Sequence, residues 1–402
     1  PDELKKDDIK VLFGDTLTVS VSSLEQYNSC PYAFFLEKGL RIKERDVKKV
    51  EAVDIGNLYH ETLKDLAYIL LKEQKELHEL ELETIESIVD ERVNALARKV
   101  QREFFYDNER NQYLLKKIKT SLFNSIIAMR YQSEHSSFKV FAVEEKFGSD
   151  AKRLVIPEKE VNGFQVQLKG FIDRIDYAKE DDKTLVRVID YKSGAKSVDF
   201  SKIFYRLSLQ LFTYLDVVLQ SSELLFPGED VIPAGVLYYH IFNSRIRANE
   251  ELTVEDIEGK HYREYRMEGY TLQDLKVSRH FDGRLEIGKG SDIVPLTLTK
   301  SGYHRSHSKV LAEDELNLVR QYTRTAIENS VKEIISGDIS INPAKYGNEP
   351  PLCQYCAFKA VCKHDVTRPE NHYRLFDRFK NRNEAIEKMK EILEGEDAHE
   401  VE

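Results

Sequence analysis

Two neighbouring apolar segments carry acidic residues near their ends, and they constrain the fold more than any other feature. They are "FQVQLKGFIDRIDY" (164–177) and "TLVRVIDYKSG" (184–194), in which β-branched and aromatic residues alternate with polar ones. The polar stretch "AKEDDK" (178–183) between them is typical of a turn. We therefore predict a hairpin of two adjacent strands.

The sequence on either side of this hairpin predicts a sheet. "FKVFAVEEKF" (138–147) shows the same alternation, residues 199–220 have the pattern of an amphipathic helix, and "AGVLYYHIF" (234–242) is a further apolar segment. Three strands, a helix and another strand in this order predict an α/β fold, with a small mixed sheet flanked by helices.

The first third of the chain has a helical pattern instead. We expect Asp54 to be the N-cap of one helix, residues 84–135 to be largely helical, and an earlier helix to be interrupted at Cys30–Pro31. The predicted segments are a helical N-terminal segment (1–137), a core (138–345) with a polar insertion at about 243–312, a cysteine segment (346–375) and a charged, loosely helical tail (376–402).

Composition narrows the class of protein. The formal net charge is −10, so DNA binding would need a local basic groove or a bound cation, and we expect the isolated chain to bind DNA weakly. No apolar run approaches the roughly 18 residues of a membrane span, and "PDELKKDDIK" is not a signal peptide. Four cysteines without a secretory signal favour a reducing cytosol. We interpret the start at Pro1 as removal of an initiator Met or as a fragment.

The hairpin carries residues suited to phosphodiester chemistry. Asp190 and Lys192 are two residues apart on a strand, so their side chains point to the same face. Asp173 on the neighbouring strand could join Asp190 on Mg²⁺, which would polarise a phosphodiester and activate a water. Lys192 could orient that water and stabilise developing charge. The alternative is a surface ion pair of little energy, and Asp176, on the opposite face from Asp173, is expected to be structural or solvated.

Three helical residues are further candidates. His60 lies at the rim of an apolar helical face, where it can be a metal ligand or a half-buried histidine. Gln210 and Tyr214 are four residues apart and share a face. They can contact a phosphate or a base, or Tyr214 can be buried between sheet and helix with Gln210 at the margin. These alternatives remain open at this point.

The motifs together resemble a known family. "GNLYHETL", "GFIDRID", "VIDYKSG" and "LQLFTYLD" resemble the RecB-type nucleases of the PD-(D/E)XK superfamily. "SVSSLEQYNSCPYAFF" and "CQYCAFKAVC" resemble the C-terminal nuclease region of AddB-type subunits of bacterial helicase–nucleases, over roughly residues 17–375. The resemblance implies a restriction-endonuclease-like core and a Mg²⁺-dependent exonuclease that processes DNA duplex ends and single strands in recombinational repair. It also implies an AddA-type partner subunit and the bacterial cytoplasm.

The resemblance also implies roles for individual residues. Lys192 would be the catalytic lysine, and Glu144, on the strand before the hairpin, lies where such nucleases often carry an acid. Gln210 and Tyr214 would support the site and the DNA. Mg²⁺ would be held by His60, Asp173, Asp190 and the backbone carbonyl of Tyr191.

Three of the four cysteines lie close together near the end of the chain. Cys353, Cys356 and Cys362 have the spacing C-x₂-C-x₅-C, which differs from the ferredoxin pattern. The residues alone favour Zn²⁺, with His364 as a fourth ligand. The resemblance implies instead a [4Fe–4S] cluster that includes Cys30 and clasps the two ends of the chain together.

Two other functions fit the motifs. A Cas4-like iron–sulfur nuclease shares the one-plus-three cysteine pattern, but the helical block at 61–135 and the insertion make this chain bulky for it. A non-catalytic DNA-end clamp is opposed by Lys192 beside two acids. "GRLEIGKG" (283–290) fits a phosphate-binding loop except that Gly290 replaces Ser or Thr, and we expect a loop without ATP binding.

Overall fold

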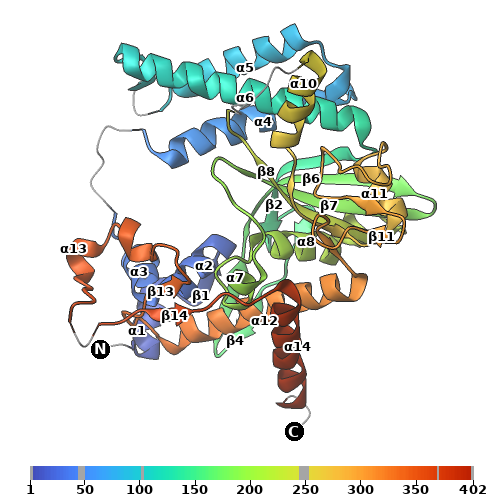
Figure 1. Ribbon diagram of the computed structural model, residues 1–402. Coiled ribbons are helices and arrows are strands. Elements are labelled where there is room, and N and C mark those ends of the chain that lie inside the picture. The colour runs from blue at the N-terminus through green and yellow to red at the C-terminus, as the bar shows by residue number, and fades with distance from the viewer. Residues whose placement is uncertain (1–2, 44–49, 101–103, 244–252, 369–370, 400–402) are drawn as a thin grey trace.

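A mixed seven-stranded sheet forms the centre of the molecule, and helices cover both of its faces (Figure 1). The computed structural model describes residues 3–43, 50–100, 104–243, 253–368 and 371–399. The strand order is β12-β9-β8-β7-β6-β2-β3. The predicted α/β class is therefore confirmed.

The predicted hairpin lies in the middle of this sheet. Strands β6 (Gly170–Glu180) and β7 (Lys183–Lys192) pair antiparallel, and β6 also pairs with β2 (Lys139–Gly148), which pairs with β3 (Leu154–Val155). On its other side β7 runs parallel to β8 (Asp230–His240). A parallel pair needs a crossover connection, and α7 (Phe200–Phe204), α8 (Gln210–Gln220) and α9 (Ser222–Leu225) lie in it.

Residues 164–177 form two strands rather than the single strand that alternation predicts. Strand β5 (Phe164–Leu168) leaves the central sheet and joins β1 (Thr16–Val19) and β4 (Lys159–Val161) in a three-stranded sheet. Gly170 opens β6, where a Cβ would lie 2.8 Å from the ring of Phe147. The separation ties the N-terminal segment to the core through parallel pairing of β1 and β5.

One face of the sheet is covered by α4 (Ala52–Glu73), α5 (Leu82–Ala97) and α6 (Glu109–His135), joined by single helical turns at Leu77–Glu79 and Phe104–Tyr106. Helix α10 (Val254–Glu264) lies beside α6 (Figure 1). The sequence predicted Asp54 as the N-cap of α4, and this prediction is wrong. Glu51 is the N-cap, and the Asp54 carboxylate accepts its N–H at 2.9 Å.

The other face is covered by α7, α8, α12 (Glu313–Ser336) and α14 (Arg382–His399). The single helix expected over 199–220 is divided after Phe204, and Arg206 in the break has a φ of 60°. The tail is not loose, because α14 buries Ala385, Ile386 and Met389 against this core. The expectation of a loosely held tail is therefore wrong for residues 382–392.

The stretch 243–312 contributes to the central sheet rather than standing apart from it. It supplies β9 (Glu268–Leu272) and β12 (Val310–Leu311), together with α11 (Leu275–Phe281) and the short pair β10 (Leu298–Thr299) and β11 (Gly302–Tyr303). A Cβ at Gly269 would lie 2.1 Å from the Val236 carbonyl oxygen, so only glycine fits at this strand crossing. Residues 283–290 form a loop, as expected, and 244–252 lie outside the described residues.

The N-terminal segment lies beside the segment that follows α12, away from the central sheet (Figure 1). The N-terminal part contains α1 (Lys6–Phe13), α2 (Val21–Ser29), α3 (Pro31–Phe34) and a π-helical turn (Phe35–Gly39), with the predicted interruption at Cys30–Pro31. The later part contains β13 (Ala344–Tyr346), a helical turn (Leu352–Tyr355), α13 (Lys359–Cys362) and β14 (Arg374–Phe376). The Tyr32 N–H donates to the Ser340 carbonyl at 3.2 Å, and Arg374 donates to the Asn28 carbonyl.

No helix in the described part of the chain combines the length and the apolar character that a bilayer crossing requires.

Candidate active site

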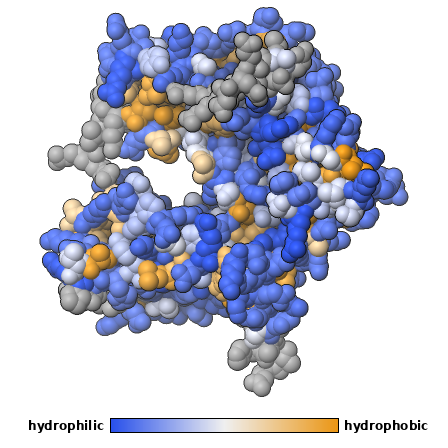
Figure 2. All heavy atoms as spheres, viewed as in Figure 1, coloured by the Kyte–Doolittle hydropathy of each residue, from blue (hydrophilic) through white to orange (hydrophobic). Residues whose placement is uncertain are grey.

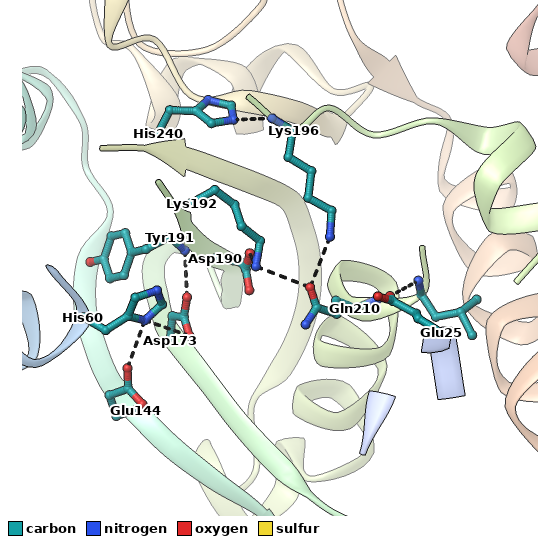
Figure 3. Close-up of polar contacts among 11 residues, drawn as sticks. Glu25, His60, Glu144, Asp173, Asp190, Tyr191, Lys192, Lys196, Gln210 and His240 are labelled. Carbon is teal, nitrogen blue, oxygen red and sulfur yellow. Dashed lines mark hydrogen bonds and ion pairs between the residues drawn. The ribbon is translucent and has the colours of Figure 1, made fainter. Parts of the chain in front are cut away.

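Three side chains from three elements converge where α4 passes the central sheet. His60 of α4, Glu144 of β2 and Asp173 of β6 place one ligand atom each within 4.8 Å of the others, and they form the one such group among the described residues. His60 Nδ1 lies 3.4 Å from Glu144 Oε1 and 3.5 Å from Asp173 Oδ1 (Figure 3). An imidazole with two carboxylates is a donor set for a divalent cation.

Glu144 reaches this group through an irregularity in its strand. The β2–β6 ladder pairs Val143 with Arg174 and Glu145 with Ile172, and it skips Glu144 and Asp173 between them. Glu144 has a φ of 47°, which is unusual for a side-chain-bearing residue inside a strand. Such conformations gather at functional sites, where local strain aims a side chain. Here the distortion brings the carboxylate to His60.

Asp190 and Lys192 lie beside this group at the end of β7. Both continue the row of Val186 and Val188, which packs toward α8, so the predicted shared face is found. Lys192 Nζ lies 2.5 Å from Asp190 Oδ2, and the Tyr191 N–H between them donates to Asp173 Oδ2 at 2.7 Å. Asp190 Oδ2 is buried and has no hydrogen-bond partner, because the ammonium of Lys192 lies close to it without the geometry of a hydrogen bond. A buried carboxylate oxygen with such poor satisfaction fits a site built for a cation.

The electrostatics of the group also fit a cation. Burial, together with the neighbouring Asp190, raises the pKa of Asp173 to about 7. Burial alone would lower the pKa of His60, but Glu144 and Asp173 outweigh it and raise that pKa. The buried carboxylates of Asp173 and Asp190 repel each other when both are charged. A divalent cation would remove that repulsion.

Gln210 and Tyr214 differ in exposure although both lie on α8. Gln210 Oε1 lies 3.4 Å from Lys192 Nζ and 3.3 Å from Lys196 Nζ (Figure 3). Tyr214 is 8% exposed and packs edge-on against Phe147. The structure therefore favours the buried alternative for Tyr214 and brings Gln210 to the site.

A buried ion network lies behind Tyr191. Asp176 has no exposed surface and accepts from Arg174 Nε at 2.6 Å and from Arg187 Nε at 3.0 Å. Arg174 also contacts the Tyr191 ring hydroxyl, and Arg187 lies over the ring of Phe138. The structural alternative for Asp176 is therefore correct. The network holds the end of β7, where Asp190 and Lys192 project.

The site opens into a cleft of about 740 Å³. Residues of the first turns of α4 form one wall, and Glu144, Tyr191, Lys192 and Ser193 form the other. The space-filling view shows the molecule hollowed between the α4–α6 block and the region of α2 and α3 (Figure 2). A bulky substrate can therefore reach the carboxylates from solvent.

The four cysteines line one small pocket, although Cys30 precedes the carboxylates in sequence and the other three follow them. Cys30, Cys353, Cys356 and Cys362 are free thiols around a space of about 20 Å³. Burial raises the pKa of Cys30, whereas the N–H groups of Ala33 and Tyr32 oppose that rise. The Phe358 N–H also donates to Cys356 Sγ at 3.4 Å. Backbone donors on sulfur favour thiolates, the form that binds metal.

The spacing of these sulfurs tests the fit to zinc. A single tetrahedral Zn²⁺ with bonds of about 2.3 Å holds its sulfurs about 3.8 Å apart. Within the described ranges no three cysteine or histidine ligand atoms lie within 4.8 Å of one another. His364 is absent from the pocket wall and packs against Tyr373. The arrangement has the right residues for a metal group, but it is wider than a single zinc ion requires.

Three neighbours of the site were not found by sequence reasoning. Glu25 of α2 accepts the N–H groups of Leu209 and Gln210, Lys196 contacts Gln210, and the Lys196 N–H donates to His240 Nε2 at 3.0 Å. Glu25 lies 185 residues from Gln210 (210 − 25), and no local pattern links them. For Lys196, the sequence offered one signal, its position four residues after Lys192.

Comparisons with known proteins agree with this geometry. Residues 18–363 match the PD-(D/E)XK nuclease superfamily. The chain is 35% identical over 397 residues to a protein of Bacillus mycoides (strain KBAB4) that is named as a subunit of an ATP-dependent helicase/deoxyribonuclease, and the match covers 98% of this chain and 34% of that protein. For the protein of the same name from Bacillus cereus (strain G9842), the identity is 35% over 388 residues, with coverages of 96% and 33%.

The chain spans about a third of the length of the curated relatives it matches. Their names agree with the resemblance drawn from the motifs around His60, the hairpin and the cysteines. The family match covers the residues from β1 to the cysteine segment, and so contains both candidate metal centres. The chain therefore belongs to the PD-(D/E)XK nuclease superfamily.

Proposed function

We propose that this chain is the Mg²⁺-dependent deoxyribonuclease domain of an AddB-type helicase–nuclease subunit. The observation that carries the proposal is the convergence of His60, Glu144 and Asp173 beside the Asp190–Lys192 pair. The family match and the names of the relatives agree with it. Its biological role would be the processing of DNA ends during recombinational repair, together with an AddA-type subunit.

The residues suit phosphodiester hydrolysis. His60, Asp173 and Asp190 would hold Mg²⁺, with Glu144 as a further acid and the Tyr191 carbonyl as a backbone ligand. When bound, Mg²⁺ supplies a polarised phosphodiester and a water of lowered pKa. The Lys192 ammonium, one quarter exposed beside the cleft, would orient that water and stabilise charge on the phosphate. Gln210 would hold the ammonium in place.

The cysteine pocket suits a [4Fe–4S] cluster better than Zn²⁺. Four cysteines surround the pocket, their sulfurs are more widely spaced than a single zinc requires, and His364 is not in its wall. The cluster would be structural, because it would join α2 to the segment that ends in β14. Iron and labile-sulfide analysis, with the visible absorbance of the purified chain, tests this, and one zinc per chain would contradict it.

The decisive experiment for catalysis is Asp190→Ala. Cleavage of linear duplex and single-stranded DNA would be measured with Mg²⁺, and we expect a loss of at least about 100-fold, because outer-shell partners of metal ligands already cost 10–100-fold. Asp182→Ala is the matched control, since Asp182 is an exposed acid in the turn of the same hairpin. Unchanged cleavage by Asp190→Ala would refute the site.

The same assay separates a nuclease from an end-binding clamp. DNA binding would be measured in Ca²⁺ and cleavage in Mg²⁺, on the same fragments. A chain that binds duplex ends and leaves them intact in Mg²⁺ would be a clamp, and the proposed catalytic function would then be wrong.

A further inference from the structure

A carboxylate outside the metal group lies at the start of the helix that carries Gln210. Glu25 is a half-buried residue of α2, and its Oε1 accepts the N–H groups of Leu209 at 2.6 Å and Gln210 at 3.1 Å. Leu209 is the N-cap of α8 and has no side-chain cap of its own. Glu25 therefore supplies the cap, and its negative charge favours the positive end of the helix.

The capped turn sets the position of the Gln210 side chain. Gln210 is the first residue of α8, and its Oε1 lies within 3.4 Å of both Lys192 Nζ and Lys196 Nζ. One amide oxygen thus orients two ammonium groups (Figure 3). A shift of the first turn of α8 would move this oxygen and release Lys192 from its place beside Asp190.

The charge of Glu25 also interacts with Lys196 and, more weakly, with Lys192. Asp190 pairs with Lys192, whereas Lys196 has no carboxylate within 4.0 Å among the described residues. Burial lowers the pKa of Lys196, and Glu25 is the group that most strongly opposes this. Burial likewise raises the pKa of Glu25, and Lys196 is the group that most strongly opposes that. The two residues therefore stabilise each other's charged form.

The helix that carries Glu25 also carries the first cysteine. Cys30 is the C-cap residue of α2, five positions after Glu25. Ser29 Oγ donates to the Glu25 carbonyl at 2.8 Å, which closes the last turn between them. A single nine-residue helix therefore connects the cysteine pocket with the first turn of α8.

We propose that Glu25 is a positioning residue for catalysis, which holds the first turn of α8 so that Gln210 aims Lys192 at the scissile phosphate. The inference rests on the proposed nuclease function, because it assigns Glu25 a part in that same site. Glu25 lies outside the group of His60, Glu144 and Asp173 and outside the lining of the cleft, so we expect its loss to change the chemical step and to leave the binding of metal and DNA intact.

The test compares Glu25→Ala with Glu25→Gln in the full 402-residue chain. For Glu25→Ala we expect kcat to fall about 10- to 100-fold, the range for outer-shell partners, with KM for DNA changed less than about 2-fold. Glu25→Gln keeps an acceptor for both N–H groups and loses the charge, so it should recover most of kcat. Glu37→Ala is the control, because Glu37 bonds Gln26 on the outer side of the same segment.

Hydrogen exchange gives a readout that does not need activity. Glu25→Ala should speed exchange of the Leu209 and Gln210 amides by at least about 10-fold, and Glu25→Gln and Glu37→Ala should not. Wild-type kcat in Glu25→Ala, a parallel rise in KM, or unchanged exchange would each overturn the proposal. A wild-type chain that does not cleave would refute the nuclease function, whereas the exchange result would still decide whether Glu25 holds α8.

Discussion

The two candidate metal centres are built in opposite ways. The carboxylate centre rests on β2, β6 and β7 of the central sheet, with one helix above, and opens into a wide cleft. The cysteine pocket is formed by helix ends and turns of segments more than 300 residues apart. One site is built on strands and opens into a cleft, whereas the other joins two segments that are distant in sequence.

The two centres also differ in the hydrogen bonds that support them. Behind the carboxylates, Asp176 binds two arginines, and Asp173 accepts a backbone N–H from β7. Around the cysteines, the bonds to sulfur come from local backbone groups, such as that of Phe358. We therefore expect the carboxylate centre to keep its shape without metal and the cysteine pocket to depend on the cluster proposed for it.

The largest expected effect is loss of the network behind the carboxylates. Asp176→Ala would leave Arg187, which is 3% exposed, without its carboxylate, and breaking a buried pair costs about 3–5 kcal/mol. The free energy of unfolding would be measured by denaturant titration. Asp182→Ala, in the exposed turn, should change it by less than about 0.5 kcal/mol. A loss below about 1 kcal/mol for Asp176→Ala would show that the sheet does not depend on this network.

The next effect concerns the cysteine pocket. Cys353→Ser should abolish the bound group and lower the free energy of unfolding by about 2–5 kcal/mol, the range for losing a covalent cross-link. Divalent binding at the carboxylates should persist, which calorimetry with Mn²⁺ would measure. Gln354→Ser, at the exposed neighbouring position, is the control. Equal unfolding midpoints for both variants would remove the contrast between the two centres.

The smallest effect is the pH dependence of the metal-free carboxylate centre. Folding raises the pKa of Asp173 from 3.8 to about 7, through burial first and Asp190 second. Between these values the folded chain binds a proton that the unfolded chain has released, so stability falls as pH rises. His60 acts in the same direction, because its neighbours raise its pKa against the effect of burial.

We expect a loss of about 1 kcal/mol between pH 6 and pH 7 in EDTA. If Mg²⁺ binds the charged form of Asp173 as proposed, it should stabilise the chain more at pH 7 than at pH 6, and thermal unfolding would record both. Asp173→Asn should flatten the profile in EDTA. Stability that rises with pH over this interval in the wild-type chain would contradict the raised pKa of Asp173.

Sequence patterns predicted the parts of the site that depend on local periodicity. Asp190 and Lys192 share a face because alternation in a strand is fixed by geometry, and the ion pair between them follows. The motif around His60 placed that residue on a helix, and the resemblance linked it to Asp173. Glu144 needed the resemblance too, because nothing in the sequence around it signals the positive φ that it adopts within β2.

The errors arose where distant residues override a continuous pattern. Residues 199–220 have an unbroken helical pattern, yet the chain breaks after Phe204, and Glu25 from α2 caps the second helix. Residues 164–177 alternate throughout, yet β5 pairs with β1 and β6 with β2. Gly170 at that division and Gly269 in β9 were the local signals, since a Cβ would crowd the Phe147 ring at the first and the Val236 backbone at the second.

The distance between the cysteines has a consequence for synthesis. Cys30 leaves the ribosome 323 residues before Cys353 (353 − 30). At about 5–20 residues per second, this takes about 16–65 seconds. During that interval the central sheet can assemble, while α2 lacks the segment against which its last turn rests. The four thiols can thus meet only after Cys362 has been made, when the strands of the central sheet have already been synthesised.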